Sequence, residues 1–436
     1  MEHLGINVNV KNVPELDAGY IPLHKFNAAF LEGAEKPLGI AVERAGGEVA
    51  VMRTFIHGTP EFEAADSYYA DRMVKSMLWL YGGWKVYISG DRDIYERIRA
   101  AYAPDGSRAF DEDFMSGVYE RPFEVVFCDE LPAEKSNPQA IGRHLGGCRI
   151  GFDAGGSDRK VSAVIDGESV FSEEVVWFPK TTADPDYHFQ GIVDAFKSAA
   201  AHMPRVDAIG VSSAGIYIEN RAMVASLFLK VPKDEFNRKV KDIYIRAAKE
   251  IGDVPLVVAN DGDVTALAGA MSLDDNNVLG IAMGTSEAVG YVDKNGCVTG
   301  WLNELAFMPV DANPDAMADE WSGDIGCGVK YFSQDAVIKL APAAGIELDP
   351  ALSPAEKLKV VQGKMEQGDA GARAIYETIG VYLGYTLAFY AMFYDINHVL
   401  LMGRVTSGEG GVILLQKAQE VLDTEFPELA KTLELH

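Results

Sequence analysis

The stretch Arg149–Ile165, RIGFDAGGSDRKVSAVI, constrains the fold of this chain more than any other segment. An apolar run leads to Asp153, two glycines follow, and alternating apolar residues lead away, which is typical of two strands joined by a tight turn. Glycine has no Cβ atom, so other atoms can approach the backbone of Gly155 and Gly156 closely. The turn also supplies side-chain donors, from Ser157, Arg159 and Lys160. These residues predict a hairpin that holds phosphate oxygens, with the Asp153 carboxylate holding a metal directly or through water. An ordinary β-hairpin would give the same letters.

Short apolar strands that end in small or polar residues recur further along the chain, at residues 207–212, 255–259, 278–283 and 398–402. Helical patterns lie around them, at residues 187–202, 236–251, 264–271, 376–395 and 412–425. This alternation predicts layers of helices and strands, an α/β fold. In open α/β sheets, ligands bind at the carboxyl ends of the strands. The residues that follow these strands are therefore the candidates for function.

The first third of the chain also has an α/β pattern. We expect residues 1–36 to be irregular, because Pro14 and Pro22 lie among scattered polar residues. Strands are predicted at residues 38–42, 49–55, 85–89 and 124–128, and helices at 66–81 and 91–102. A segment rich in proline, glycine and polar residues, 132–147, is the best candidate for a domain boundary. We therefore predict three domains, at residues 1–148, 149–273 and 274–436.

Charge and cysteine spacing exclude several classes of protein. The formal net charge of -26 argues against non-specific binding to nucleic acid or to anionic membranes. The four cysteines are widely spaced and form no CxxC pair, so neither a disulfide framework nor a zinc site is indicated. The N-terminus has no signal-peptide pattern, and no apolar run approaches the length of a membrane helix. These features predict a cytoplasmic protein.

Five motifs occur in the order and rough spacing found in one known family. They are FDAGGS at 152–157, IGVSSAGI at 209–216, VVANDGDVTALAG at 257–269, MGTSEAVGYV at 283–292 and INHVLLMGRV at 396–405. Together they make residues 149–436 resemble the ROK family of sugar kinases and related repressors. The resemblance implies a two-lobed actin-like ATPase (ribonuclease H-like) fold, here with an additional N-terminal α/β domain.

The resemblance also implies a function, an ATP-dependent kinase that uses Mg²⁺ and phosphorylates a hydroxyl of a sugar or sugar-like substrate. Asp261 takes the place of the family's general base, which accepts the hydroxyl proton during phosphoryl transfer. The implied substrate-binding residues are Ser213, Gly215, Asn260 and Glu304. The implied nucleotide-binding residues are Asp153, Gly155, Gly156, Ser157, Lys160, Gly284, Thr285, Ser286, Gly403 and Arg404, with Asp153 also positioning the metal. From the residues alone, Asn260-Asp261-Gly262 fits a turn or a helix N-cap as well.

Several family residues are replaced in this chain. Phe307 stands where the family has a zinc-binding histidine, Val329 stands where it has a second sugar-binding glutamate, and Cys327 alone remains of the cysteine cluster. One thiolate cannot make a tetrahedral zinc site, so structural zinc is not expected. Apolar groups cannot replace hydrogen bonds to a sugar, which leaves open a ligand-binding sensor or regulatory protein without turnover. An ATPase that drives a partner protein is a third alternative.

Two further expectations concern the ends of the chain. The family's repressors carry a DNA-binding helix-turn-helix, but residues 1–148 have no basic recognition helix, so DNA binding is not expected. This N-terminal part could widen the substrate cleft, form the surface of a homodimer, or stabilise the rest. After the helix at 412–425 the family adds a strand and a closing helix, and we expect both to be missing here.

Overall fold

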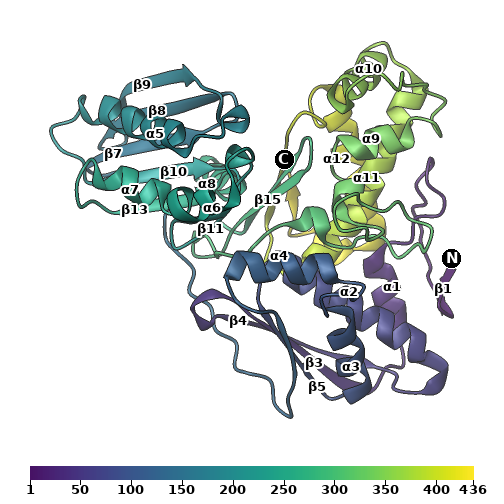
Figure 1. Cartoon of the computed structure of the whole chain (residues 1–436). Coiled ribbons are helices and arrows are strands. Elements are labelled where there is room, and N and C mark those ends of the chain that lie inside the picture. Colours follow the sequence, from purple (N-terminus) through teal and green to yellow (C-terminus); the bar gives the residue numbers. More distant parts are fainter. The chain divides into compact units, whose positions relative to one another are not determined.

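The computed structural model describes residues 1–436, which form two compact units (Figure 1). The first unit contains Met1–Asn137, Asp275–Asn295 and Trp301–His436. The second unit contains Pro138–Asp274 and Gly296–Gly300. The first unit thus groups the N-terminal residues with most of the predicted third domain. The division into three domains stays a prediction.

The second unit is built on a five-stranded sheet in the order β13-β10-β7-β8-β9. Its strands are β7 (Cys148–Ala154), β8 (Asp158–Ile165), β9 (Glu168–Val176), β10 (Ala208–Ser213) and β13 (Leu256–Asn260). β7, β8 and β9 form an antiparallel meander, and β10 runs parallel to both β7 and β13. The predicted glycine hairpin and its neighbouring strands are confirmed. A small hairpin of β11 (Ile216–Ile218) and β12 (Arg221–Val224) follows β10.

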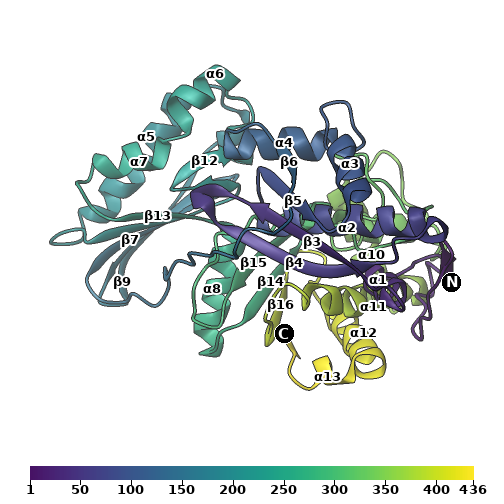
Figure 2. The same cartoon turned by 90° about the horizontal axis from the view of Figure 1, so that it is seen from below.

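Helices lie on both faces of this sheet. α5 (Pro185–Ala200) and α7 (Ile243–Lys249) pack on the face that carries Ile150, Phe152 and Val211, and together they form the core of the unit. α8 (Asp261–Leu273) lies on the opposite face, as the view from below shows (Figure 2). The single helix predicted at residues 236–251 was wrong. A helical segment, α6 (Lys233–Glu235), and a π-helical turn, Phe236–Val240, precede α7, and the Lys241 N–H bonds to the Phe236 carbonyl in the wider π pattern.

The first unit contains two four-stranded sheets. One has the order β15-β14-β16-β17, with β14 (Val278–Met283), β15 (Glu287–Val292), β16 (His398–Met402) and β17 (Glu434–Leu435). β14 pairs antiparallel with β15 and parallel with β16, and β16 pairs parallel with β17. The predicted absence of a strand after residue 425 was wrong, because Glu434 and Leu435 extend this sheet as its edge strand. A short helix, α13 (Pro427–Ala430), leads into that strand.

The other sheet of the first unit comes from the N-terminal residues, in the order β4-β3-β5-β6. Its strands are β3 (Lys36–Glu43), β4 (Val49–Ile56), β5 (Lys85–Ser89) and β6 (Glu124–Phe127). The helices α2 (Glu63–Tyr81), α3 (Arg92–Ala101) and α4 (Ala109–Tyr119) connect these strands or pack beside them (Figure 1). The strands and the first two helices confirm the α/β pattern predicted for this region.

The prediction that residues 1–36 are irregular holds for residues 8–22 but was wrong for the helix that follows them. Besides the two-residue strands β1 (Glu2–His3) and β2 (Ile6–Asn7), residues 1–36 form the helix α1 (Leu23–Leu31). Leu23, Phe26 and Phe30 are buried at helical spacing on this helix. Pro22 lies at its N-cap, where a proline does not interrupt helical hydrogen bonds. The proline marked the start of a helix rather than its absence.

The C-terminal helices of the first unit are α9 (Gln334–Leu340), α10 (Pro354–Glu366), α11 (Ala370–Tyr390) and α12 (Glu409–Glu425). α11 and α12 pack side by side, and Gly380 and Gly384 let the backbones approach, since a Cβ at either position would meet a carbonyl of α12 at 2.6 to 2.8 Å. One hydrophobic core joins these helices to the N-terminal residues, and it includes the buried Phe26, Trp79 and Tyr385. None of the helices combines the length and the apolar character needed to cross a lipid bilayer.

Candidate functional site

The carboxyl ends of three neighbouring strands bring several predicted residues together in the second unit. Asp153 at the end of β7 pairs with Ser212 of β10, and Ser213 pairs with Asn260 of β13. Asp261 follows Asn260 directly and opens α8. The candidate metal residue and the candidate base therefore lie at the same end of one sheet, at the ends of strands β7 and β13, which flank β10.

The tip of the first glycine hairpin, Gly155–Ser157, is held from outside by Trp177. The indole Nε1 of Trp177 donates to the carbonyl oxygen of Gly155 at 2.8 Å. The backbone N–H of Trp177 donates to the carbonyl oxygen of Ser157 at 3.1 Å. Trp177 itself is buried, while Gly156 and Ser157 are exposed. The tip of the hairpin is therefore exposed to solvent while its backbone is held in place by the two hydrogen bonds from Trp177.

Two lysines lie near this hairpin, and they differ in their partners. Lys160, the predicted phosphate ligand, has its Nζ 3.4 Å from a carboxylate oxygen of Asp158. Lys180 lies against the tip, with its Nζ 2.9 Å from the place that a Cβ on Gly156 would occupy. Lys180 is exposed and makes no hydrogen bond or ion pair in the structure. Sequence reasoning missed Lys180, because it belongs to no motif and reaches the hairpin only through the docking of Trp177.

A cavity of about 510 Å³ opens on the sheet face that α8 partly covers. Asp153 and Lys160 line it, together with the small residues Gly151, Gly210 and Ser212 of the same sheet face. The small side chains leave this face hollow, while the opposite face is filled by α5 and α7. Two of the predicted nucleotide-binding side chains thus face a space that a ligand could enter.

Asn260 and Asp261 have different local roles. Asn260 is the N-cap of α8, since its Oδ1 accepts the Gly262 N–H at 2.7 Å, and its Nδ2 donates to the Gly215 carbonyl at 2.7 Å. Asp261 is only partly buried. Burial raises the pKa of the Asp261 carboxyl, and the nearby Asp153 carboxylate raises it further. A hydrogen bond from the Gly262 backbone acts in the opposite direction and lowers this pKa. Asp261 is a reachable carboxylate with a raised affinity for protons, as a general base requires.

The hydroxyl of Ser213 is hydrogen-bonded to other side chains of the protein. The Ser213 side chain is fully buried, and its hydroxyl bonds to the Tyr217 hydroxyl at 2.7 Å and to the Tyr244 hydroxyl at 3.0 Å. Gly215 has φ of 136° and contributes the carbonyl that fixes Asn260. The substrate-binding roles of Ser213 and Gly215 stay predictions.

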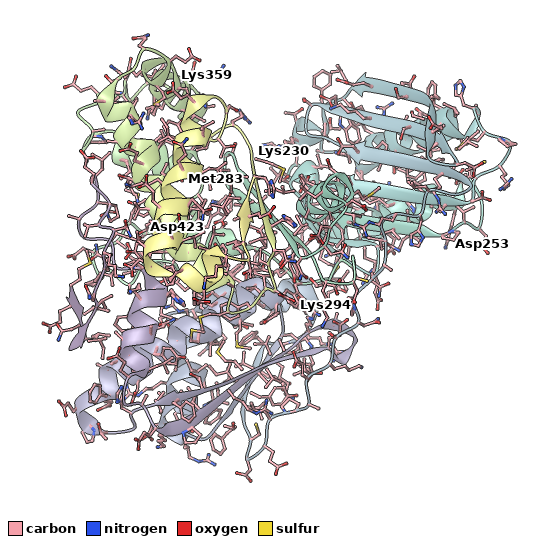
Figure 3. The ribbon with its side chains drawn as sticks, turned by 180° about the vertical axis from the view of Figure 1, so that it is seen from behind. Lys230, Asp253, Met283, Lys294, Lys359 and Asp423 are labelled. Atoms are coloured by element: carbon pink, nitrogen blue, oxygen red, sulfur yellow. The ribbon has the colours of Figure 1, made fainter.

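The first unit brings together the second glycine turn and the loop after β16. In the turn, the Gly284 N–H donates to the Ser286 carbonyl at 3.0 Å, and Thr285 and Ser286 are exposed. Gly403 follows β16 with φ of 98°, and a side chain there would overlap the backbone of Met283, the last residue of β14 (Figure 3). The exposed Arg404 comes next. The predicted residues 284–286 and 403–404 therefore lie at adjacent strand ends.

Glu287, directly after this turn, is a buried carboxyl that sequence reasoning missed. Its Oε1 accepts a hydrogen bond from the Tyr390 hydroxyl at 3.2 Å, and its Oε2 has no partner. Burial raises the pKa of Glu287 to about 8; the Tyr390 hydrogen bond opposes this, and the Glu304 carboxylate contributes to it. The only sequence signal was one acidic letter in an otherwise small and apolar strand.

The residues that replace the family's zinc ligands are packed into the first unit. Phe307 packs at tilted angles against the rings of Trp79, Phe110 and Phe114, and the nearest ring centroid, that of Trp79, lies 4.4 Å away. Cys327 is buried, and burial raises the pKa of its thiol to about 12. A neutral thiol and a phenyl ring do not fit a zinc site at this place. Glu304 precedes the 3₁₀ turn Leu305–Phe307 and is partly buried.

Buried ion pairs hold the neighbouring loop to the N-terminal helices. Asp324 pairs with Arg72 at 2.9 Å, with Lys75 at 3.1 Å and with Arg108 at 2.9 Å. Arg72 and Lys75 belong to α2 and are almost completely buried. We call Asp324, Arg72, Lys75 and Arg108 the Asp324 cluster. It fastens the segment around Cys327 without a metal ligand.

Comparison with known proteins gives a consistent result. The model of the ROK family matches residues 149–433. Among solved structures, the chain is similar to a ROK family transcriptional regulator that is a homolog of the E. coli MLC protein. The two chains share 18% sequence identity with a TM-score of 0.51, and the match covers 67% of this chain and 74% of that one. It is similar to the ROK hexokinase from Thermus thermophilus at 18% identity and a TM-score of 0.51, covering 66% of this chain and 91% of that one. A search of curated proteins found no match. At this identity the likenesses establish the fold.

Proposed function

This chain belongs to the ROK family, as its sequence motifs indicated, and we propose that it is an ATP-dependent kinase. The proposed reaction transfers the γ-phosphoryl group of ATP to a hydroxyl of a sugar or sugar-like molecule. The family includes both kinases and regulators, so membership alone does not decide between them. The choice rests on the residues of this chain.

The observation that carries the proposal is the environment of Asp261. It opens α8 at the end of a strand, is partly exposed, and has a raised pKa because of burial. In the proposed reaction Asp261 accepts the proton of the substrate hydroxyl while its oxygen attacks the γ-phosphorus. The bond from phosphorus to the bridging oxygen breaks, and ADP leaves with that oxygen. A protein that only sensed a sugar would have no use for such a base.

We assign a phosphate-binding turn to each unit. In the second unit the turn is Gly155–Ser157, with Lys160 and the unpaired Lys180 beside it. In the first unit the turn is Gly284–Ser286, with the Gly403–Arg404 loop beside it on the adenosine side. Backbone N–H groups in such turns and nearby cations are suited to phosphate oxygens.

The residues around Asp153 fit a hydrated magnesium ion. Its carboxylate is exposed and lines the cavity of the second unit, and Mg²⁺ is usually held by one or two carboxylates together with phosphate and water. When bound, the ion would neutralise charge on the β- and γ-phosphates. Asp153 would hold it, and Asn260 would orient a hydroxyl of the acceptor near Asp261.

A ligand-binding regulator without turnover is the second candidate. The observation that favours it is the aromatic packing of Phe307, which puts an apolar ring at the position of the family's zinc-binding histidine. Glu304 remains as a polar residue on that side. An acceptor with fewer polar groups than glucose would reconcile a working kinase with this packing.

The experiment measures ADP formation by the full-length protein with Mg-ATP and a panel of sugars and polyols. The proposal expects acceptor-dependent ADP formation, and it expects Asp261→Asn to lower kcat by about 10² to 10⁴. Asp274→Asn, at the exposed C-terminal end of the same helix, is the matched control and should keep full activity. Sugar binding without ADP formation would instead support the regulator, and acceptor-independent turnover would support a partner-driving ATPase.

A further inference from the structure

Three side chains at the edge of the first unit's sheet bring their ligand atoms together. The Nδ1 atom of His398 lies 3.1 Å from Nε2 of His436 and 3.6 Å from a carboxylate oxygen of Glu434. The same Glu434 oxygen lies 3.7 Å from Nε2 of His436. These atoms are the only group of three or more histidine, cysteine or acidic ligand atoms in the chain that lie close enough to hold a metal ion.

The strand register explains why they converge. His398 opens β16 and pairs with Glu434 of the parallel strand β17, so their side chains are direct neighbours. His436 lies two residues after Glu434 and therefore points to the same face of the sheet. Backbone bonds continue past β17, since the His436 N–H donates to the Val399 carbonyl and the Leu401 N–H donates to the His436 carbonyl, at 2.9 Å each. The three ligands are held by regular sheet pairing.

Asp275 determines which nitrogen of His398 is available. The other ring nitrogen, Nε2, lies 3.0 Å from a carboxylate oxygen of Asp275, in the loop before β14. A proton on Nε2 is shared with that carboxylate, which leaves a lone pair on Nδ1. A histidine held by a carboxylate on one nitrogen and free to ligate with the other is the usual arrangement behind a bound metal.

The separations between the ligand atoms are close to those of a tetrahedral metal site. A tetrahedral ion with bonds of about 2.0–2.2 Å to nitrogen and oxygen keeps its ligand atoms about 3.3–3.6 Å apart. The observed separations are 3.1, 3.6 and 3.7 Å. We propose that His398, Glu434 and His436 bind one divalent transition-metal ion of the zinc class, with a fourth position open to water. Two imidazoles and one carboxylate are a donor set that prefers such ions over Mg²⁺ or Ca²⁺.

The place of this site argues for a structural or regulatory ion. The cluster lies at the amino end of β16, whereas the Gly403–Arg404 loop follows its carboxyl end, about 16 Å away along the strand. The side chain of His398 is 10% exposed, that of His436 is 33% exposed and that of Glu434 is 69% exposed, so an ion can enter from solvent. Bound there, it would fasten the two-residue strand β17 to β16. The site is separate from the place of the family's zinc motif around Cys327.

The test uses the full-length protein without a polyhistidine tag, stripped of metal and titrated with Zn²⁺ and, in parallel, with Co²⁺. We expect one ion per chain and the strong visible absorption of tetrahedral Co²⁺. Asp275→Asn should weaken Zn²⁺ binding 10- to 100-fold, as is typical when a carboxylate behind a ligand is lost, and Glu434→Gln should weaken it at least tenfold. His436→Ala should abolish binding at the site. His144→Ala, an exposed histidine of the second unit, is the control and should bind as the wild type does.

Two results would overturn the proposal. One is a wild-type protein that takes up no Zn²⁺ at micromolar concentration, which would mean that the two imidazoles share only a proton. The other is uptake that the Glu434, His436 and Asp275 variants do not change. Because Glu434 is largely exposed, its variant tests ligation even if the His436 variant loosens β17. Hydrogen exchange of residues 430–436 with and without Zn²⁺ provides a readout independent of catalysis, and slower exchange with the ion is expected.

Discussion

We expect the buried carboxyl of Glu287 to make the stability of the first unit depend on pH. In the folded protein the pKa of Glu287 is about 8, against an ordinary value of 4.5. The folded chain therefore keeps this proton up to about pH 8, whereas the unfolded chain loses it near 4.5. The contribution of the protonated Glu287 to the free energy of unfolding is complete below the pKa that Glu287 has in the unfolded chain. This contribution is lost as the pH rises through the pKa that Glu287 has in the folded chain.

The magnitude follows from the size of the shift. Between these two pKa values, each pH unit changes the free energy of unfolding by about 1.4 kcal/mol through this one group. From about pH 5 to about pH 8, Glu287 therefore costs the protein about 4 kcal/mol, a large part of the about 5–15 kcal/mol that stabilises a typical domain. In Glu287→Gln the group is neutral at every pH, so this loss disappears.

The assay is urea unfolding of the wild type and of Glu287→Gln at several pH values, with hydrogen exchange of α11, which carries Tyr390, to follow the first unit. We expect the variant to gain stability relative to the wild type as the pH rises, and to be the more stable protein near pH 8. Glu366→Gln, an exposed glutamate in the same unit without a hydrogen-bond partner, should show no such trend. A stability difference between Glu287→Gln and wild type that stays constant with pH would refute the reasoning.

Two further predictions concern charged residues. Lys180→Gln should raise the KM for ATP about tenfold or more with little change in kcat, since a charge-assisted hydrogen bond to phosphate contributes about 1.5–3 kcal/mol. Nucleotide titration of Lys180→Gln, with Lys197→Gln as the control variant, measures the effect. Equal nucleotide affinities of the two variants would show that Lys180 does not bind phosphate. Asp324→Asn should lower the free energy of unfolding of the first unit by about 1.5–3 kcal/mol, because Arg72, Lys75 and Arg108 each lose one of two carboxylate partners while Asp71 and Asp111 remain. Thermal unfolding of Asp324→Asn tests this, with the exposed Asp315→Asn as the control variant. Equal melting temperatures of the two variants would contradict the prediction.

Local patterns predicted most of the fold. The hairpin at Arg149–Ile165 and the strands around it follow from period-two alternation and glycine turns, which act over a few neighbouring residues. The helix α1 was missed because two prolines outweighed the helical spacing of Leu23, Phe26 and Phe30. The broken helix before α7 was missed because a π-turn depends on packing rather than on composition. The family fold itself was predicted from five motifs in order, and the comparisons confirm it.

Long-range packing was beyond the reach of such patterns. The motif residues at strand ends could be found because each motif is contiguous in sequence. Lys180 reaches its hairpin through the docking of Trp177, and Glu287 is buried by α11, so neither spacing nor composition marks them. The ligands of the proposed metal site, His398 and Glu434, come together only through the register of two strands.

The shared core of the first unit has a consequence for how the chain folds during synthesis. Residues 1–137 leave the ribosome first, yet their core partners lie mainly in Trp301–His436, and the compact Pro138–Asp274 segment comes between them. At translation rates of about 5–20 residues per second, the last of these partners arrives about 15–60 s after residue 137. During that time Trp79 and Phe26 have no complete core, while the second unit can already close. The nascent chain should therefore depend on a chaperone that shields its N-terminal sheet, and slowing its translation should increase aggregation.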